Sequence, residues 1–255
     1  ILNDASELDI REAIDLMIPT GCSKSLIRVG SKADGGYLVP NHLEGIDACF
    51  SPGVGGVTDF EDHLYEEWKI PSYLCDDSQD ESKLSLNPVS KCFSKNRLGS
   101  LDFKGQMTLD TWVRKSQHCQ SEDLLLQMDI EGSEYPSLLS TSDSILKKFR
   151  IIVIEFHWLT QLGNRRFLNM NFNPVMKKLL EYFDCVHAHA NLSDIYINFS
   201  SVKYDYNINV PAAIELTFYR KGLNRFKNPP QIPHPLDYSN DINSPSKNLG
   251  KPWTT

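Results

Sequence analysis

The sequence has no long apolar run, no excess of basic residues and no dinucleotide-binding glycine motif. A membrane-spanning helix needs about 20 consecutive apolar residues, so no membrane span is predicted. Lysine and arginine total 26 against 33 aspartates and glutamates, which gives a net charge of −7. Surfaces that bind nucleic-acid phosphates are basic, so this balance argues against nucleic acid as the main partner, although it leaves open a local basic groove.

Cysteines at the CxxC spacing of zinc and thioredoxin-like sites are also absent. The six cysteines are scattered along 255 residues, and we expect them to be reduced and mostly buried, as in a cytoplasmic (intracellular) protein. Residues 1–9 are mixed and acidic, so no secretory signal is predicted. The chain begins at Ile1 rather than at methionine, and we expect it to be a piece of a longer protein.

The composition, 40% hydrophobic and 23% charged, predicts one large α/β domain with short extensions. We place this domain at residues 1–223, with residues 1–45 forming an N-terminal helix and a hairpin. Helical spacing of apolar residues over 7–17 indicates the helix. From residue 224 to residue 255 proline, asparagine, serine and lysine dominate, which predicts a loosely ordered C-terminal tail.

From residue 46 onward, segments with the apolar pattern of buried strands alternate with segments of helical periodicity. The predicted strands are 48–50, 72–77, 89–93, 124–128, 150–157, 185–189 and 212–219. The predicted helices are 58–69, 107–113, 135–139, 144–149 and 174–183, and a long loop is expected at 158–173. This alternation is typical of an α/β fold with a mostly parallel sheet, whose last two strands we expect to form an antiparallel pair.

A glycine-rich turn follows the first of these strands. Gly53, Gly55 and Gly56 stand between the strand and a helix that begins at Thr58 or Asp59. Strand, glycine turn and helix form the first unit of nucleotide-binding α/β folds. The glycines lack the GxGxxG spacing, so a dinucleotide is not indicated, and the acidic start of the helix suits a ligand without a pyrophosphate.

Two further polar turns are candidates for ligand contact. The second strand ends in Asp76 and Asp77, where α/β folds hold a ribose diol, although a solvated turn also carries acids of this kind. Asp34, Gly35 and Gly36 lie between two short extended runs. This pattern predicts a hairpin, and because glycines let a backbone approach closely, it also suits a lid over a ligand.

The stretch LLLQMDIEGSE, residues 124–134, organises the predicted site. Its apolar strand ends in Asp129, Glu131 and Glu134, and the following strand, RIIVIEFH, ends in Glu155 and His157. Ligands of open α/β sheets bind in the crevice outside the carboxyl ends of the strands. Glu155 and His157 are two residues apart and therefore project to the same face. These strand ends are predicted to form the floor of an active site, although Glu131 and Glu134 also suit a helix cap.

These features resemble the FkbM-type family of S-adenosylmethionine-dependent methyltransferases. The resemblance rests on LLLQMDIEGSE, which matches a hydrophobic strand followed by D-x-E-G-x-E, on MTLDTW before it and on IIVIEFH after it. HAN at 189–191 and PAAIELTFYRK near the end extend it over about residues 26–221. The resemblance implies a seven-stranded Rossmann-like sheet, S-adenosylmethionine as the methyl donor and an oxygen acceptor, often on a sugar.

The resemblance also implies a cofactor site. Its residues would be Ser51, Gly53, Gly55, Asp76, Asp77, Thr108, Leu109, Asp110 and Asp129. The glycines would lie under the cofactor, Asp76 at its ribose, residues 108–110 by its adenine and Asp129 near its sulfonium. The chain has SPGVGG where the family more often carries an acid before the first glycine, so the resemblance does not say how the methionine amine is held.

Methyl transfer to a hydroxyl needs the acceptor oxygen in line with the methyl group and a way to remove or acidify its proton. A histidine or carboxylate could act as the general base, or a divalent metal such as Mg²⁺ or Mn²⁺ could bind the hydroxyl. The catalytic candidates are Asp129, His157 and His189, and the metal candidates are Asp129, Glu155 and His157. The glutamate and histidines also suit hydrogen-bonded structural roles.

Residues for the acceptor are sought among aromatic and polar side chains near the strand ends, because sugars stack on aromatic rings. The candidates are Glu131, Trp158, Arg165, Arg166, Asn191 and Tyr204. We therefore expect an S-adenosylmethionine-dependent O-methyltransferase that acts on a sugar hydroxyl of a glycan. Two alternatives stay open: a non-catalytic Rossmann-like binding or scaffold module, and a methyltransferase whose acceptor is a small molecule or a protein side chain.

Overall fold

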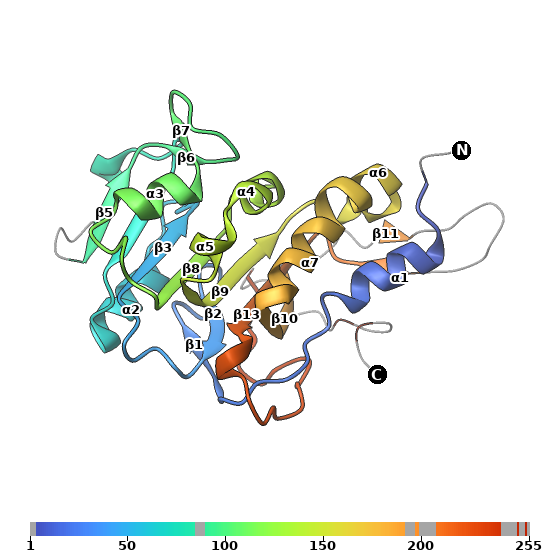
Figure 1. Cartoon of the computed structure of the whole chain (residues 1–255). Helices are drawn as coiled ribbons and strands as arrows, with labels where there is room; N and C mark the ends of the chain where they lie inside the picture. Colours follow the sequence, from blue (N-terminus) through green and yellow to red (C-terminus); the bar gives the residue numbers. More distant parts are fainter. Residues whose placement is uncertain are drawn as a thin grey trace.

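The computed structural model describes residues 4–84, 90–191, 197–198, 208–240, 249 and 253. Its centre is a seven-stranded sheet with the strand order β10-β13-β9-β8-β3-β4-β5 (Figure 1). The strands are β3 (Ala48–Pro52), β4 (Ser72–Cys75), β5 (Lys91–Ser94), β8 (Leu124–Met128), β9 (Phe149–Phe156), β10 (Phe183–Asn191) and β13 (Ala213–Arg220). Short strands form separate pairs: β1 (Leu26–Val29) with β2 (Tyr37–Pro40), β6 (Arg97–Leu98) with β7 (Gln106–Met107), and β11 (Ile197–Asn198) with β12 (Asn209–Val210).

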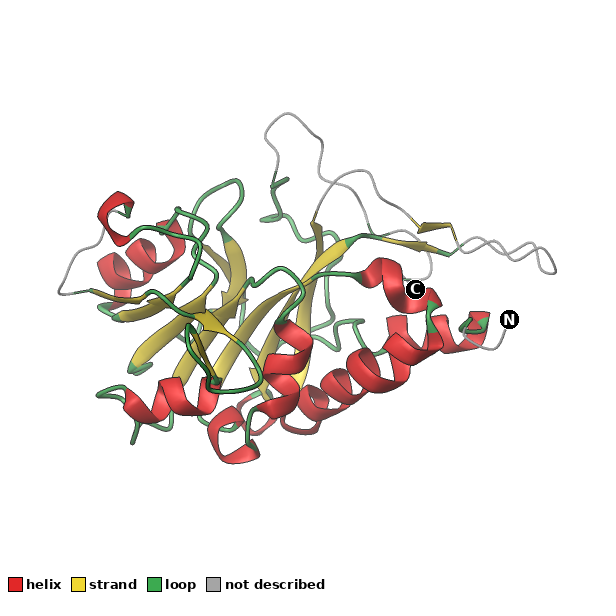
Figure 2. Cartoon of the chain, turned by 90° about the horizontal axis from the view of Figure 1, so that it is seen from above, coloured by secondary structure: helices red, strands yellow, loops and turns green. Residues whose placement is uncertain are grey.

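The helices lie on both sides of the sheet (Figure 2). They are α1 (Glu7–Asp15), α2 (Asp59–Trp68), α3 (Leu109–Lys115), α4 (Glu134–Ser140), α5 (Asp143–Leu146), α6 (Arg165–Phe167) and α7 (Asn173–Tyr182). Short helical turns occur at Glu81–Lys83, Leu159–Gly163, Leu168–Phe172 and Lys221–Leu223. Because both faces of the central strands are covered, these strands are apolar without alternation, as the sequence indicated.

The strand directions confirm the predicted seven-stranded, Rossmann-like sheet with an antiparallel last strand. Strands β5, β4, β3, β8 and β9 pair in parallel, whereas the last strand, β13, is antiparallel to both of its neighbours, β9 and β10. The strand order reverses between β3 and β8, since the chain continues from β3 to β4 on one side and reaches β8 on the other. Ligands of such sheets bind outside the carboxyl ends of the strands at this switch point.

Strand β9 shows how the two faces are packed. Ile152 and Ile154 belong to a large core with α1, α3, α4 and α7, whereas Ile151 and Val153 pack on the opposite face with α2 and the β1–β2 hairpin. The same alternation places Glu155 on the hairpin side, because side chains two residues apart share a face. The hairpin turns at residues 34–36, as predicted, beside the carboxyl ends of the central strands.

The segment 158–173, predicted to be a long loop, is mostly helical, so this prediction is wrong. Helical turns at Leu159–Gly163, α6 and Leu168–Phe172 lead directly into α7. Asn164 starts α6 by accepting hydrogen bonds from the backbone N–H groups of Arg166 and Phe167. Phe167 and Phe172 then bury their rings in the core. The helical pattern was hidden because its turns are of different types and carry many polar residues.

The first part of the predicted loose tail packs against the sheet edge. Asn224 donates hydrogen bonds to Gly21 O and to Asp184 at 2.9 Å. Further along, Asp237 pairs with His187 at 3.0 Å. Most of 241–255, and Tyr204, lie outside the described residues. Among the helices that the structure describes, none is long and apolar enough to span a membrane.

Candidate active site

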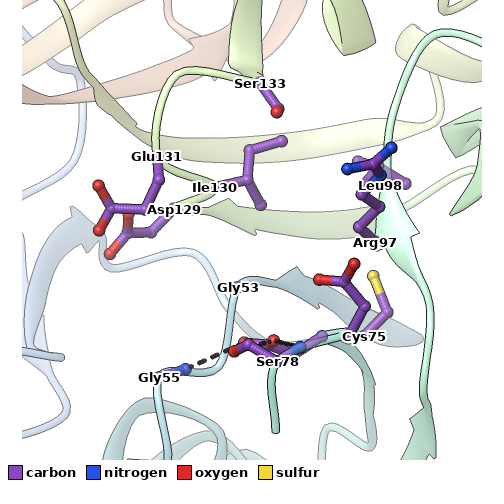
Figure 3. Close-up of a pocket in the computed structure, with 12 residues that line it drawn as sticks. Gly53, Gly55, Cys75, Ser78, Arg97, Leu98, Asp129, Ile130, Glu131 and Ser133 are labelled. Atoms are coloured by element: carbon purple, nitrogen blue, oxygen red, sulfur yellow. Dashed lines mark hydrogen bonds between the residues drawn. The ribbon is translucent and has the colours of Figure 1, made fainter.

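A cleft of about 410 Å³ opens at the carboxyl ends of β3, β4 and β8. Five of the predicted cofactor residues line it: Gly53, Gly55, Asp76, Asp77 and Asp129. Figure 3 shows Asp129 and Glu131 at one end of the cleft and Arg97 and Leu98 at the other, with Ile130 between them. The cleft therefore lies at the switch point of the sheet, where its topology places a ligand site.

The glycine turn brings the backbones of β3 and β8 together. Gly53 has φ +86°, and a Cβ there would lie 1.5 Å from the carbonyl oxygen of Asp129. The backbone N–H of Asp129 in turn donates to Pro52 O at 3.2 Å. Glycine is required at residue 53 because only glycine combines this backbone conformation with such a close approach.

Asp76 fixes the shape of the glycine turn. Its Oδ2 accepts hydrogen bonds from the backbone N–H groups of Val54 at 3.2 Å and Gly55 at 3.4 Å. Its Oδ1 accepts from the backbone N–H and the hydroxyl of Ser78. The neighbouring Asp77 is exposed and lines the cleft as well. The cleft thus carries two carboxylates at the end of β4, where the sequence predicts ribose binding.

The other predicted cofactor residues do not line the cleft. Thr108 caps α3, Leu109 is fully buried in the core, and Asp110 accepts a hydrogen bond from the backbone of Ser142 at 2.8 Å. Instead, Arg97 and Leu98 of β6 line the far end. No sequence pattern indicated this short strand, because it lies in a polar, irregular stretch.

Ser51 lies beneath the glycine turn in a buried hydrogen-bond network. Its hydroxyl contacts carboxylate Oε1 of Glu61 and the side-chain oxygen of Gln127, the latter at 2.6 Å, and Gln127 donates to Tyr37 at 3.2 Å. A serine hydroxyl has one proton and cannot donate to both oxygens. Burial raises the pKa of Glu61, which is fully enclosed. The hydroxyl can therefore donate to only one of these two side chains and accepts from the other, and the network holds Ser51 in place beneath the glycine turn.

The strand ends bring His157 together with several carboxylates. His157 Nε2 lies 3.4 Å from Glu155 Oε1, 3.4 Å from Glu131 Oε2 and 3.8 Å from Asp129 Oδ1. Its Nδ1 lies 3.0 Å from Glu134 Oε1. Asp129, Glu155 and His157, which the sequence predicted as neighbours, do lie together. We refer to Asp129, Glu131, Glu134, Glu155 and His157 as the His157 cluster.

Glu134 organises this cluster, a role that the sequence did not reveal. Besides contacting His157, its Oε1 accepts hydrogen bonds from the backbone N–H groups of Ile130 at 3.1 Å and Gly132 at 3.2 Å. Its side chain is fully buried. Glu134 therefore fixes both the loop that carries Asp129 and the orientation of the imidazole ring.

Two carboxylates of the cluster, those of Asp129 and Glu155, have raised pKa values. The pKa of Asp129 is raised to about 7: burial is the largest cause, His157 opposes it, and Glu131 and Glu134 add to it. Burial and the nearby Asp129 also raise the pKa of Glu155 well above its ordinary range. Burial lowers the pKa of His157, but the hydrogen bond and charge of Glu134 outweigh this effect and raise it. The cluster can therefore exchange protons near neutral pH.

His189 and Asn191 lie on β10, one strand beyond β13. Asn191 donates a hydrogen bond to Glu155 Oε1 at 2.6 Å, which connects it to the His157 cluster. His189 instead faces Glu215 at 3.2 Å. Burial lowers the pKa of His189, but its hydrogen bond to Glu215 raises it overall. The structure thus pairs His189 with a carboxylate outside the cluster, and its catalytic role stays a prediction.

The predicted acceptor residues separate into two groups. Glu131 lines the cleft and Trp158 directly follows His157, so both lie at the cluster. Arg165 turns away and contacts Asp9 at 3.3 Å. Its neighbour Arg166 lines a separate pocket with Trp158.

The hairpin turn adds a second, smaller cavity beside the cleft. Asp34, Gly35 and Tyr37 line this space of about 80 Å³ together with Gly53 and Asp129, which also line the main cleft. Asp34 contributes to raising the pKa of Asp129, although burial is the largest cause. The glycine-rich hairpin therefore lies over the end of the cleft, the position expected for a lid.

Comparison with solved structures finds distant likenesses. The precorrin-6y C5,15-methyltransferase of Geobacter metallireducens matches with a TM-score of 0.37 and 9% identity, over 71% of this chain and 83% of that chain. Protein 1320 of Thermoplasma acidophilum matches with a TM-score of 0.33 and 11% identity, over 70% of this chain and 79% of that chain. Structural similarity this low does not allow an activity to be inferred for this chain.

Comparison with curated proteins finds no match. The model of the methyltransferase FkbM domain matches residues 39–187. This range runs from the second strand of the hairpin to β10 and includes the glycine turn, the cleft and the His157 cluster. The chain belongs to the FkbM methyltransferase domain family.

Proposed function

We propose that this protein is an S-adenosylmethionine-dependent O-methyltransferase that methylates a sugar hydroxyl of a glycan. The observation that carries the proposal is the position of Asp129. It lines the cleft behind the glycine turn and also lies 3.8 Å from His157. Asp129 therefore belongs both to the cleft proposed to hold the cofactor and to the cluster whose His157 is proposed to accept a proton. Methyl transfer to a hydroxyl requires these two parts to lie side by side.

The lining of the cleft fits S-adenosylmethionine. Gly53 and Gly55 expose backbone to a ligand, Asp76 and Asp77 offer acceptors for ribose hydroxyls, and Leu98 offers an apolar surface for a base. The acidic lining also suits a ligand that carries an ammonium and a sulfonium charge. When bound, S-adenosylmethionine supplies an electrophilic methyl group.

The protein's own contribution is to remove the acceptor proton. With Nδ1–H donated to Glu134, the neutral imidazole of His157 keeps Nε2 as an acceptor. His157 Nε2 takes the proton of the acceptor hydroxyl, and the surrounding carboxylates stabilise the imidazolium that results. Glu134 holds the ring in the tautomer that this transfer needs.

A divalent cation is the second form of this proposal. Ligand atoms of Asp129, Glu134 and His157 lie within 4.8 Å of one another. One carboxylate oxygen each of Asp129, Glu134 and Glu155 is buried without a hydrogen-bond partner among the described residues. Asp129 and His157, together with Glu134 or the neighbouring Glu155, would then hold Mg²⁺ or Mn²⁺, which would lower the pKa of the acceptor hydroxyl.

Calorimetric titration with S-adenosylhomocysteine tests the cofactor site. We expect micromolar binding that Asp76→Ala weakens at least tenfold and that Asp110→Asn, outside the cleft, leaves unchanged. Repeating the titration with Mg²⁺ or Mn²⁺ separates the two forms of the proposal, because only the metal form predicts that the ion binds and that Asp129→Ala abolishes this binding. Absence of S-adenosylhomocysteine binding would refute the proposal and favour a non-catalytic scaffold module.

Transfer of a tritiated methyl group to candidate glycans tests the acceptor class. We expect His157→Ala to lose transfer while it keeps S-adenosylhomocysteine binding. Transfer to proteins or small molecules but to no glycan would contradict the sugar acceptor. The six cysteines, all unpaired, support the proposal that the protein works in a reducing, intracellular compartment.

A further inference from the structure

The separate pocket that Trp158 and Arg166 line has a volume of about 460 Å³ and lies beside the His157 cluster. We refer to it as the Trp158 pocket. Its lining combines one exposed aromatic ring, three neutral amides and one cation: Trp158, Gln161, Asn164, Asn171 and Arg166. The buried Phe167 lines it as well. We propose that this pocket is a subsite for an acidic sugar ring next to the ring that is methylated. The acceptor is then an oligosaccharide that contains a uronic acid. This inference rests on the proposed function.

Trp158 has the properties of a stacking platform. Its side chain is 53% exposed, the largest exposure of any tryptophan in the described residues. Its φ of +59° is unusual for a bulky residue, so the surrounding structure must hold it in place. The indole lies against Gly132, where a Cβ would approach it to 2.3 Å. One part of the ring is thus supported by backbone, and the rest is available to a ligand.

The platform is coupled to the reaction centre by the chain itself. Trp158 directly follows His157, and consecutive Cα atoms are about 3.8 Å apart. Gly132, which supports the indole, donates its N–H to Glu134, the residue that orients His157. A sugar ring stacked on Trp158 therefore lies next to a ring whose hydroxyl faces His157.

Charge selects the kind of sugar. The His157 cluster gathers four carboxylates, which repel an anionic substituent at the methylated ring. Arg166 is exposed in the Trp158 pocket, and no carboxylate of the described residues pairs with it. A guanidinium binds a carboxylate in a bidentate manner. The acidic ring is therefore directed to Arg166 and away from the reaction centre.

The neutral side chains fit the hydroxyls of the same ring. Amide groups of Gln161 and Asn171 both donate and accept hydrogen bonds, as sugar hydroxyls do. The Oδ1 of Asn164 is already engaged by the backbone of Arg166 and Phe167, which leaves its NH₂ group for a ligand. A pocket of amides around one aromatic ring suits a carbohydrate better than an apolar ligand.

The test uses matched acidic and neutral glycans. The probes are trigalacturonate, trimannuronate and a hyaluronan tetrasaccharide, each compared with its carboxyl-reduced form by calorimetric titration. We expect at least one acidic probe to bind at least fivefold more tightly than its reduced form. Arg166→Gln should remove this preference, whereas the matched control Arg165→Gln should preserve it. Trp158→Ala should weaken both forms at least tenfold, and Trp158→Phe should restore most of the affinity.

Several results would overturn the inference. Binding of none of the acidic probes, equal binding of the acidic and reduced forms, or equal effects of the two arginine variants would each do so. Titration of the same variants with S-adenosylhomocysteine verifies their folding and separates this inference from the proposed function. Absence of the acidic preference in the wild type, with intact S-adenosylhomocysteine binding, refutes the subsite alone, and absence of S-adenosylhomocysteine binding in the wild type refutes the methyltransferase proposal.

Discussion

Replacement of Asp129 by asparagine should make the protein more stable at pH 8. Burial raises the pKa of this carboxyl to about 7, with Glu131 and Glu134 adding to the effect. The folded protein therefore binds this proton more tightly than the unfolded chain does. As the pH rises from about 4 to about 7, the free energy of unfolding falls, and above pH 7 the charged carboxylate destabilises the fold fully. Asparagine keeps the shape and removes the charge.

The size of this gain follows from the difference between the two pKa values. The interval from 3.8 to about 7 corresponds, at about 1.4 kcal/mol for each pH unit, to about 4 kcal/mol. The side chain is 26% exposed, so solvent screens part of the repulsion. The new amide must also find hydrogen-bond partners among the same carboxylates. We therefore expect a gain of about 2 kcal/mol at pH 8 that disappears near pH 4.

Asp123, at the opposite end of strand β8, provides a matched control. Its Oδ1 accepts hydrogen bonds from Arg150 at 2.9 Å and from Arg220 at 3.0 Å. Burial raises the pKa of Asp123, but the two arginines outweigh it and lower the pKa overall. Its contribution to stability is therefore present above the ordinary pKa of aspartate and is lost as the pH falls through the lowered value. Because the side chain is 36% exposed, we expect Asp123→Asn to cost only about 1 kcal/mol at pH 8.

Urea unfolding of the three proteins at pH 4, 6 and 8, with a chelator and without S-adenosylmethionine, measures both effects. The two variants should shift the unfolding midpoint at pH 8 in opposite directions. At pH 4 Asp129→Asn should converge on the wild type, whereas Asp123→Asn should keep most of its cost, because the pKa of Asp123 is lowered below its ordinary value. If Asp129→Asn is as destabilising as Asp123→Asn at pH 8, the carboxyl of Asp129 is not held in a repulsive environment and the electrostatic reasoning is refuted.

Two further predictions concern the floor of the cleft. Gly53→Ala places a Cβ 1.5 Å from the carbonyl oxygen of Asp129 and should lower the free energy of unfolding, measured in urea, by at least about 3 kcal/mol. Gly55→Ala is the matched control, because a Cβ there meets nothing within 4 Å. It should cost only about 1 to 2 kcal/mol, because its backbone is left-handed. Glu61→Gln keeps a hydrogen-bonding group beside Ser51 and should stay within about 1 kcal/mol of the wild type, but Glu61→Leu leaves that hydroxyl without this partner and should cost about 2 to 3 kcal/mol. An equal cost for both Glu61 variants would contradict the stabilising role of this buried hydrogen bond.

The sheet and its strand ends could be predicted because their signals are local. A buried strand shows as a short apolar run, and an acid that follows it lies at the carboxyl edge whatever the rest of the chain does. The role of Glu134 could not be read in this way. At the start of α4 it resembles a helix cap, but its oxygen bonds the N–H groups of the preceding loop and the imidazole of His157. These contacts depend on how the loop and the next strand meet in three dimensions.

The distinction between Arg165 and Arg166 was equally hidden. Adjacent residues on a helical turn point in different directions, so one contacts Asp9 and the other lines the pocket with Trp158. Because residues 158–173 were predicted to form a loop, no side-chain direction could be inferred for Arg165 or Arg166. The one available signal was Asn164, a residue type that is favoured at the first position of a helix. Had this cap been recognised, a helical turn at 165–167 would have followed.

Three independent kinds of energetic cost coincide at the carboxyl ends of β8 and β9. Of the seven buried side-chain atoms without a partner among the described residues, three belong to Asp129, Glu134 and Glu155. Two of the four described non-glycine residues with positive φ are Glu131 and Trp158. The same short segments hold like charges, which add to the raised pKa values of Asp129 and Glu155. A fold selected for stability alone has no reason to concentrate these costs, whereas a ligand that neutralises charge and stacks on an indole would relieve them. Their coincidence therefore marks this edge as the working site by an argument that does not depend on family membership.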